Sequence, residues 1–128
     1  MFDTHDLSGY ETDLDETGET VVLCGASAYE EKYYLNPLFE RMPEDIKDEL
    51  QIICVLFVEE NSGIFTMEFN EDHELLFKTR ASGGDYNYDE IGAALSVRQI
   101  EKNRRQLIES LELYYKVVIL GMPLEEQD

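Results

Sequence analysis

Two adjacent segments in the middle of the chain, residues 63–69 and 74–79, carry β-prone residues and are separated by the polar link "NEDH". Such segments predict strands, and a four-residue polar link predicts that the strands form a hairpin. In the first strand Phe65, Met67 and Phe69 share one face, because successive side chains point to opposite sides. We therefore expect helices to cover that aromatic face.

Upstream of this hairpin, the pattern predicts a strand at 20–24 and then a short helix that ends near Pro37. Ser27 and Glu30 have the spacing of a capping box, which favours a helix start there. A second helix is expected after Pro43, because a proline in the first turn followed by two acids is typical of a helix start.

The apolar run "IICVLFV" at 52–58 is compatible with two structures. As a continuation of the helix after Pro43, it would share one helical face with Ile46 and Leu50. Its β-branched and aromatic residues, followed by the turn-like "EENSG", favour a strand. We expect a helix up to about Gln51 and a strand after it.

The last third of the chain has the clearest helical period. Apolar side chains recur at steps of three, four and seven residues; they are Val97, Ile100, Leu107, Ile108, Leu111, Tyr114, Tyr115 and Val118. Ser96 and Gln99 have capping-box spacing at the start, and Gly121 and Pro123 close the pattern. One long C-terminal helix is therefore expected.

These elements predict an α+β fold, in which a small antiparallel sheet of about three to four strands packs against the long C-terminal helix and shorter helices. No repeat or linker divides residues 20–121, which we interpret as one domain. Residues 1–19 carry seven acids and no lysine or arginine, which predicts a flexible acidic tail. Residues 122–128 are expected to form a flexible C-terminal tail.

The charge of the chain disfavours some kinds of binding partner and favours others. The 128 residues include 29 acids against 10 lysines and arginines, a formal net charge of −19 at pH 7. Such a field opposes binding to nucleic acid or to an anionic membrane, and it attracts basic proteins. A simpler interpretation is that the acids keep a small protein soluble.

The cysteine usage is typical of a reduced intracellular protein. Cys24 and Cys54 have no partner at CxxC spacing, which predicts neither a disulfide framework nor a zinc site, and no cofactor is expected. The N-terminus has no signal-peptide pattern, and the run at 52–58 is too short to span a bilayer. We expect a soluble, cytoplasmic protein.

Cys24 is the candidate nucleophile, because it stands where the strand at 20–24 meets the predicted helix, and a helix N-terminus can lower the pKa of a thiol. The other interpretation is a buried cysteine that acts as a small apolar side chain. No Walker A, GxSxG, HExxH or Rossmann pattern occurs in the sequence. No catalytic residue is assigned, and an enzyme is the less favoured function.

The segment "DYNYDEIG" at 85–92 places acids and an amide at alternate positions, as a calcium loop does. A calcium loop would need glycine where Glu90 stands, and the segment also lacks the final glutamate. The pattern instead predicts a helix start with Asn87 as N-cap and with Ile91 and Leu95 facing the core. The residues that this helix start leaves unexplained are candidate site residues: Asp85, Tyr86 and Tyr88.

Four of the ten bases fall within eight residues near the start of the last helix: Arg98, Lys102, Arg104 and Arg105. Ion pairs with acids of the same molecule would explain them. The alternative is a docking patch for an acidic surface, a phosphate group or a second copy of the chain. Tyr114 and Tyr115 indicate another route to a homodimer, through the apolar side of the last helix, although core packing explains them as well.

Three runs carry a resemblance to a known family: "ELQIICVLFVEENSGIFTMEF", then "YDEIG" and then "LELYYKVV". Together they resemble an uncharacterised family of short acidic proteins from anaerobic clostridial bacteria, a domain of unknown function. The likeness covers most of residues 20–120. It implies a cytoplasmic bacterial protein and supplies no function and no site residues.

Two functions from different classes remain. The charge favours a non-enzymatic interaction or regulatory module that binds a basic protein partner. The alternative is a small-ligand-binding protein or an enzyme with a pocket between sheet and helices, which would use Cys24 or the cluster at 85–90.

Overall fold

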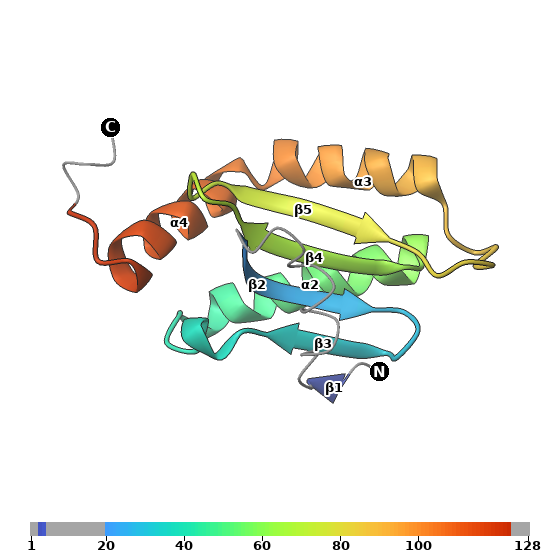
Figure 1. Ribbon diagram of the computed structural model, residues 1–128, viewed down its shortest axis with the longest axis horizontal. Helices are drawn as coiled ribbons and strands as arrows, with labels where there is room; N and C mark the ends of the chain where they lie inside the picture. The colour runs from blue at the N-terminus through green and yellow to red at the C-terminus, as the bar shows by residue number, and fades with distance from the viewer. Residues whose placement is uncertain (1–2, 5–19, 124–128) are drawn as a thin grey trace.

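A mainly antiparallel sheet with helices on one of its faces forms the fold in the computed structural model, which describes residues 3–4 and 20–123 (Figure 1). The α+β prediction is confirmed. In chain order the elements are β1 (Asp3–Thr4), β2 (Val21–Ser27), β3 (Lys32–Leu35), the 3₁₀ turn η1 (Pro37–Phe39), α2 (Glu44–Asn61), β4 (Ile64–Phe69), β5 (Leu75–Arg80), α3 (Glu90–Asn103), α4 (Arg105–Tyr114) and the π-helical turn η2 (Tyr115–Ile119).

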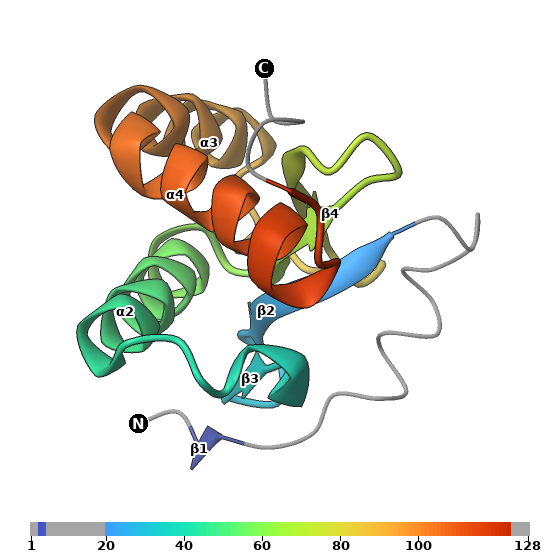
Figure 2. The same cartoon turned by 90° about the vertical axis from the view of Figure 1, so that its left-hand side faces the viewer.

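The strands lie in the order β1-β3-β2-β4-β5. From β3 to β5 all neighbours are antiparallel, and the two-residue β1 runs parallel to β3. The predicted hairpin is β4–β5, in which Phe69 pairs with Leu75 and Ile64 with Arg80. Figure 2 shows α2, α3 and α4 on the same side of the sheet.

α2 is helical over all of its 18 residues, so the predicted strand at 52–58 is wrong. The helix prevails because Leu50, Cys54 and Phe57 form one buried stripe, which a strand would divide between its two faces. The predicted helix start after Pro43, with two acids in the first turn, is confirmed. Burial against the sheet therefore outweighs the β-propensity of this run.

Residues 25–35 form most of a hairpin and not the predicted helix. The Ser27 hydroxyl accepts hydrogen bonds from the backbone N–H groups of Tyr29 and Glu30, so it stabilises the β2–β3 turn instead of capping a helix. The strand also places the ring of Tyr33 in the core, where it is 3% exposed. Pairing with β2 thus overrides the local capping-box signal.

The predicted long C-terminal helix begins earlier than its capping-box signal and is divided in two. α3 passes through Ser96, whose hydroxyl accepts a hydrogen bond from the Asn61 side chain of α2. The chain bends at Arg104, which has non-helical φ and ψ, and α4 follows. Because of this bend, Leu111 and Tyr115 lie in the core. In a straight helix that continued the direction of α3, these side chains would not reach it.

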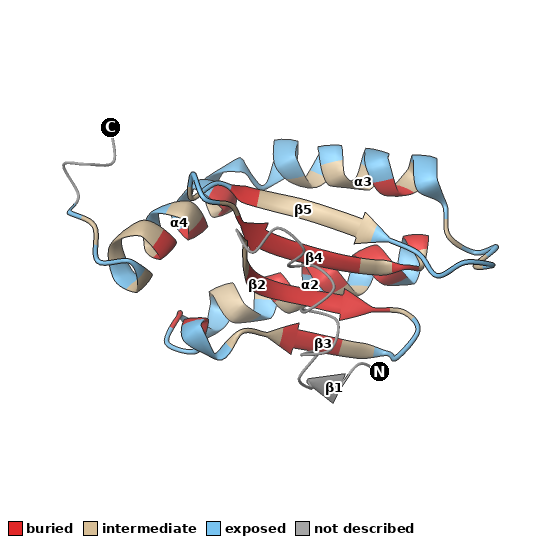
Figure 3. Cartoon of the chain, viewed as in Figure 1, coloured by how far each residue is buried: buried red, intermediate tan, exposed pale blue. Residues whose placement is uncertain are grey.

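Aromatic rings from the helices and the sheet meet in the core, so the prediction that helices cover the aromatic face of β4 is confirmed. Phe65 stacks on Phe57 of α2 with ring centroids 4.2 Å apart, and Phe69 stacks on Tyr115 at the same distance. Figure 3 shows that buried residues concentrate in β2 and β4. On α2 the buried residues are Leu50, Ile53, Cys54, Phe57, Val58 and Asn61.

The predicted tails lie largely outside the described residues. Of 1–19 the structure describes only Asp3 and Thr4, as β1, and of 122–128 it describes 122–123. The single domain over 20–121 stays a prediction. In the described part of the chain, no helix combines the length and the apolar character that crossing a membrane requires.

We expect Phe69→Ala to lower the free energy of unfolding by about 3–5 kcal/mol, because the fully buried ring stacks on Tyr115 and its removal leaves a cavity. Chemical denaturation followed by circular dichroism measures this change. Tyr86→Ala is the matched control, since that ring is 98% exposed and its loss should change stability by less than about 0.5 kcal/mol. Equal effects of the two substitutions would contradict this account of the core.

Candidate functional site

Three connections meet at one end of the sheet, on the right of Figure 1: the β2–β3 turn, the α2–β4 junction and the β5–α3 loop. Backbone hydrogen bonds hold them together, from Ala28 N to Gly63 O at 2.9 Å and from Asp89 N to Asn61 O at 3.3 Å. Seven acids lie on these connections and the adjoining helix ends; they are Glu30, Glu31, Glu59, Glu60, Asp85, Asp89 and Glu90. We call this surface the acidic end. In the described residues, no three potential ligands are placed to hold a metal ion.

Asp85 ties the acidic end together. Its Oδ2 accepts hydrogen bonds from the hydroxyls of Tyr29 at 2.5 Å and Ser62 at 2.8 Å, and its Oδ1 accepts one from the backbone N–H of Asn87 at 2.9 Å. The Tyr29 hydroxyl in turn accepts a hydrogen bond from Ser82 N at 3.0 Å. These donors, with Tyr29 first, hold the pKa of Asp85 below its ordinary value. Asp85 therefore anchors the β5–α3 loop.

The two tyrosines beside Asp85 have opposite environments. Tyr88 packs on the α2–β4 junction, where a Cβ on Gly63 would lie 2.8 Å from its ring, and its hydroxyl is 3.0 Å from Thr79 Oγ1. Tyr86 is 98% exposed and makes no hydrogen bond to any described residue. Of the three residues that the helix start left unexplained, Tyr86 is thus the one that no internal contact explains.

The helix after this loop has Asp89 as its N-cap and not Asn87, because the Asp89 carboxylate accepts a hydrogen bond from the backbone N–H three residues later. Ile91 and Leu95, which we expected to face the core, are 75% and 56% exposed. Ala93 is buried in their place, and at the neighbouring Gly92 an added Cβ would lie 3.0 Å from Asn61 Oδ1 of α2. The orientation of α3 is therefore set by close packing against α2 and not by its largest apolar residues.

Cys24 lies inside β2, so its predicted position beside a helix N-terminus is wrong. The fold brings it to Cys54 of α2, with the two sulfur atoms 3.6 Å apart and both side chains fully buried. Tyr33 lies beside this pair, and burial raises the pKa of its hydroxyl and of the Cys54 thiol. A fully buried thiol is a poor nucleophile, so this geometry favours the interpretation of Cys24 as a small core residue.

Glu68 is a buried acid on the face of β4 that points away from the helices. Its carboxylate accepts a hydrogen bond from Thr66 Oγ1 at 2.8 Å and lies 3.1 Å from Lys78 Nζ on the neighbouring strand β5. A buried carboxylate needs such partners, because an unpaired charge in the interior is costly. We therefore assign Glu68 a structural role in joining β4 to β5.

The fold groups three of the four candidate bases and sets Arg98 apart. Arg104 pairs with Glu49 of α2, as the interpretation of internal ion pairs predicts. Lys102, Arg104 and Arg105 border an open hollow of about 500 Å³ at the α3–α4 junction, which does not include Arg98. Neither Arg98 nor Lys102 forms an ion pair with a described residue. Internal pairing thus explains one of the four bases; the other three, Arg98 and Lys102 on α3 and Arg105 on α4, form no ion pair with a described residue.

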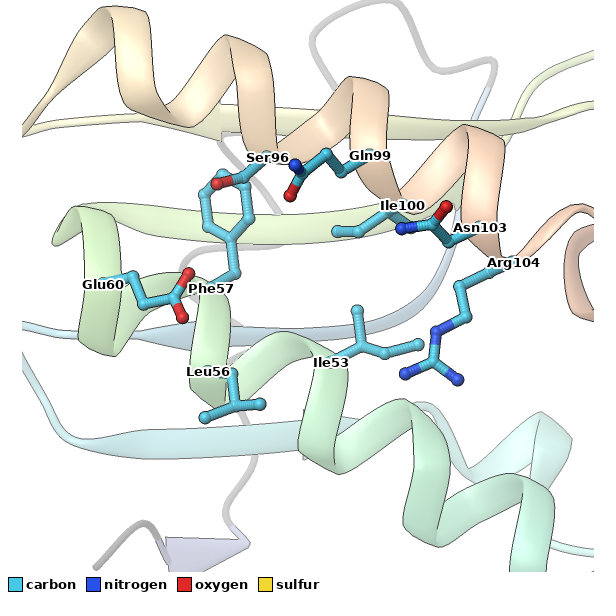
Figure 4. A pocket seen from close by; sticks show the side chains of 9 residues that line it. All are labelled: Ile53, Leu56, Phe57, Glu60, Ser96, Gln99, Ile100, Asn103 and Arg104. Carbon is cyan, nitrogen blue, oxygen red and sulfur yellow. The ribbon is translucent and has the colours of Figure 1, made fainter.

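A groove of about 190 Å³ runs along the outside of the helical layer, between α2 and α3 (Figure 4). Ile53, Phe57 and Ile100 give it an apolar floor, and Figure 4 shows Glu60 at one end and Arg104 at the other. Of the candidate site residues from the sequence, Arg104 is the one that lines it. The groove belongs to two helices and not to the interface between sheet and helices.

Sequence reasoning missed this groove because it assigned 52–58 to a strand. A helical reading of the same run places Ile52 and Leu56 two residues from Cys54, about 200° around the helix from the core. In the structure these two side chains are 54% and 49% exposed. The sequence therefore did contain a signal for an exposed apolar surface here, namely two apolar residues on the outer side of an acidic helix.

We expect a thiol reagent such as DTNB to label the native protein at least roughly 100-fold more slowly than the unfolded protein, because both thiols are fully buried and react only on opening. The rate of absorbance change at pH 8, with and without denaturant, measures this. Rapid labelling of one thiol in the native state, abolished in Cys24→Ala, would restore Cys24 as a reactive site.

We expect Asp85→Asn to lower the melting temperature at pH 7, because the amide cannot replace the charged acceptor of Tyr29 and Ser62. A carboxylate with a lowered pKa stabilises the fold above its ordinary value of 3.8, and this stabilisation disappears as the pH falls through the folded-state pKa. The difference between wild type and variant should therefore shrink below pH 3.8. Asp72→Asn, in the exposed β4–β5 turn, is the control and should show no difference at either pH.

Comparison with known proteins gives the chain a family. Searches of curated proteins and of solved structures returned no match. Residues 20–123 match a family of unknown function, and this span includes the three runs that carry the resemblance seen in the sequence. Since the match covers well over half of the chain, the protein belongs to DUF6145, a family of unknown function.

Proposed function

We propose that this protein is a non-enzymatic interaction module of the bacterial cytoplasm, which binds a basic protein partner through its acidic end. The observation that carries the proposal is Tyr86, a fully exposed aromatic side chain on a loop anchored by Asp85 and surrounded by acids. Both thiols are free and buried, which suits the reducing cytoplasm and leaves Cys24 without access to a substrate.

The charge of the acidic end supports a basic partner. Six of its seven acids are exposed, and the bases nearest in the chain are Lys32 and Arg80, at the ends of β3 and β5. Lys32 lies 3.9 Å from Glu30, so it offsets one of those acids. The remaining negative field attracts a basic surface over a distance and raises its association rate.

The rigidity of the loop supports recognition by contact. Because Asp85 fixes the loop to the β2–β3 turn and to the end of α2, presenting Tyr86 costs little conformational entropy on binding. Tyrosine is enriched in interface hot spots, and its ring attracts lysine and arginine through its π face. Tyr86 therefore combines an apolar anchor with preference for a basic partner.

Affinity capture with four forms of the full chain tests this function: wild type, Tyr86→Ala, Glu30→Lys with Glu31→Lys, and Glu71→Lys with Asp72→Lys. The last pair carries the same charge change on the β4–β5 turn, at the opposite end of the sheet. Each form is incubated with lysate of the source cells, and mass spectrometry identifies what is retained. We expect wild type and the Glu71/Asp72 form to retain the same basic protein.

The Tyr86 and Glu30/Glu31 variants should retain that protein at least about 10-fold less, and higher salt should weaken its capture by wild type. Retention that is equal for all four forms, or the absence of any basic protein, would overturn the proposal. Circular dichroism of each variant confirms that the fold is intact.

A further inference from the structure

The helical layer presents two stripes of exposed residues, one on each side of the α2–α3 groove. On α2 the stripe consists of Asp45, Asp48, Ile52, Leu56 and Glu59, which follow one another at steps of three or four residues. On α3 it consists of Ile91, Leu95, Arg98 and Lys102, spaced in the same way. All nine side chains are exposed. We call this surface the α2–α3 face.

Both stripes point away from the sheet. Ile52 and Leu56 are each two residues from Cys54, which is buried against β2, and two residues correspond to about 200° around a helix. Ile91 and Leu95 stand in the same relation to the buried Ala93. The fold therefore leaves four large apolar side chains, 49–75% exposed, on one outer surface.

The two stripes carry opposite charges. The α2 stripe contains three acids and no base, and the α3 stripe contains two bases and no acid. None of these five charged side chains forms an ion pair with a residue in the described part of the chain. An apolar surface with an acidic half and a basic half is complementary to itself, because a twofold rotation exchanges the halves.

We propose that a second copy of this chain docks on the α2–α3 face, with a twofold axis along the groove. Such an axis places α2 of each copy against α3 of the other, so the acidic stripe meets the basic stripe twice. This homodimer differs from the predicted one through Tyr114 and Tyr115, because Tyr115 is buried in the core on Phe69. It shares Glu59 with the acidic end and otherwise uses different residues.

The register of this interface follows from contacts within one chain. Arg104 lies beside Glu49 and Ser96 beside Asn61, which fixes the antiparallel alignment of α2 and α3. Rotation about an axis along the groove preserves positions along the groove. Lys102 of the second copy therefore comes opposite the stretch from Asp48 to Ile52, and Leu95 of the second copy comes opposite Leu56 and Glu59. The apolar contact between Leu95 and Leu56 thus lies next to contacts between side chains of opposite charge, such as Lys102 with Asp48.

The size of the face sets the expected affinity. α2 has 18 residues and is about 27 Å long, and two helices side by side span about 20 Å, so each copy buries roughly 500 Å². A total near 1,000 Å² lies at the lower limit for specific interfaces, so we expect a weak dimer that dissociates on dilution. At physiological salt, charges more than about 8 Å apart are largely screened, which weakens the repulsion between two chains of net charge −19 more than the attraction of close pairs.

The twofold axis also determines where the acidic ends lie. Each acidic end is at the end of the groove where α2 stops and α3 starts, and an axis along the groove keeps both at the same end of the dimer. A partner with two basic segments would then contact both copies, and its apparent affinity would rise through avidity.

Charge exchange tests the dimer by sedimentation velocity and light scattering, over about 1–500 μM at physiological salt. Wild type should change from monomer to dimer as its concentration rises. The basic-stripe variant, Arg98→Glu with Lys102→Glu, and the acidic-stripe variant, Asp48→Lys with Glu59→Lys, should each stay monomeric, with at least a 10-fold loss of affinity. An equimolar mixture of the two variants should form a heterodimer, because each reversed stripe then meets an opposite charge.

A second mixture controls for net charge. Glu71→Lys with Asp72→Lys gives the same net charge as the acidic-stripe variant but places the lysines on the β4–β5 turn. Mixed with the basic-stripe variant, it should yield no heterodimer. Leu56→Glu should abolish the wild-type dimer without changing capture at the acidic end. A wild type that is monomeric at every concentration, or variants that dimerise as well as wild type, would overturn the proposal and leave the face to another occupant.

Discussion

The packing of α2 against β2 and β4 constrains the rest of this structure. Phe57 stacks on Phe65, and Cys54 contacts Cys24, so the inner side of α2 is buried against the sheet. The outer side of the helix, with its acids and its two exposed apolar residues, is then left to solvent or to a partner. The end of α2 is equally determined, because the chain must enter β4 directly after it.

Two surfaces follow from this arrangement, and they adjoin at Glu59 near the end of α2. The acidic end gathers the turns at one edge of the layers, and Asp85 fixes its geometry by accepting hydrogen bonds from two of them. The α2–α3 face covers the outside of the helices, where the burial of Ala93 and the close approach of Gly92 to Asn61 leave Ile91 and Leu95 on the outer side.

The successes and failures of sequence prediction have a common physical origin. The β4–β5 hairpin and the start of α2 were predictable because their signals agree with the contacts that the elements make in the fold. The capping-box spacings at Ser27 and Ser96 misled, because one hydroxyl stabilises a turn between strands and the other accepts a hydrogen bond from Asn61. A local hydrogen-bonding pattern is satisfied in more than one way, and burial decides between them.

The candidate site, too, was predictable only in part. Asp85 and Tyr86 were identified from an unusual run of side chains, yet the sequence could not separate the anchor from the exposed ring, because Tyr29 and Ser62 are 56 and 23 residues away from Asp85. The pairing of Cys24 with Cys54 depends likewise on a contact across 30 residues.

By itself the sequence determined the α+β class, the strongly acidic charge and the aromatic face of β4, because composition and short periods are local properties of the chain. Only the tertiary structure decided that 52–58 is helical, where α3 bends and which apolar residues remain outside. Those outcomes depend on which surfaces compete for the same core, and that competition involves residues far apart in the chain.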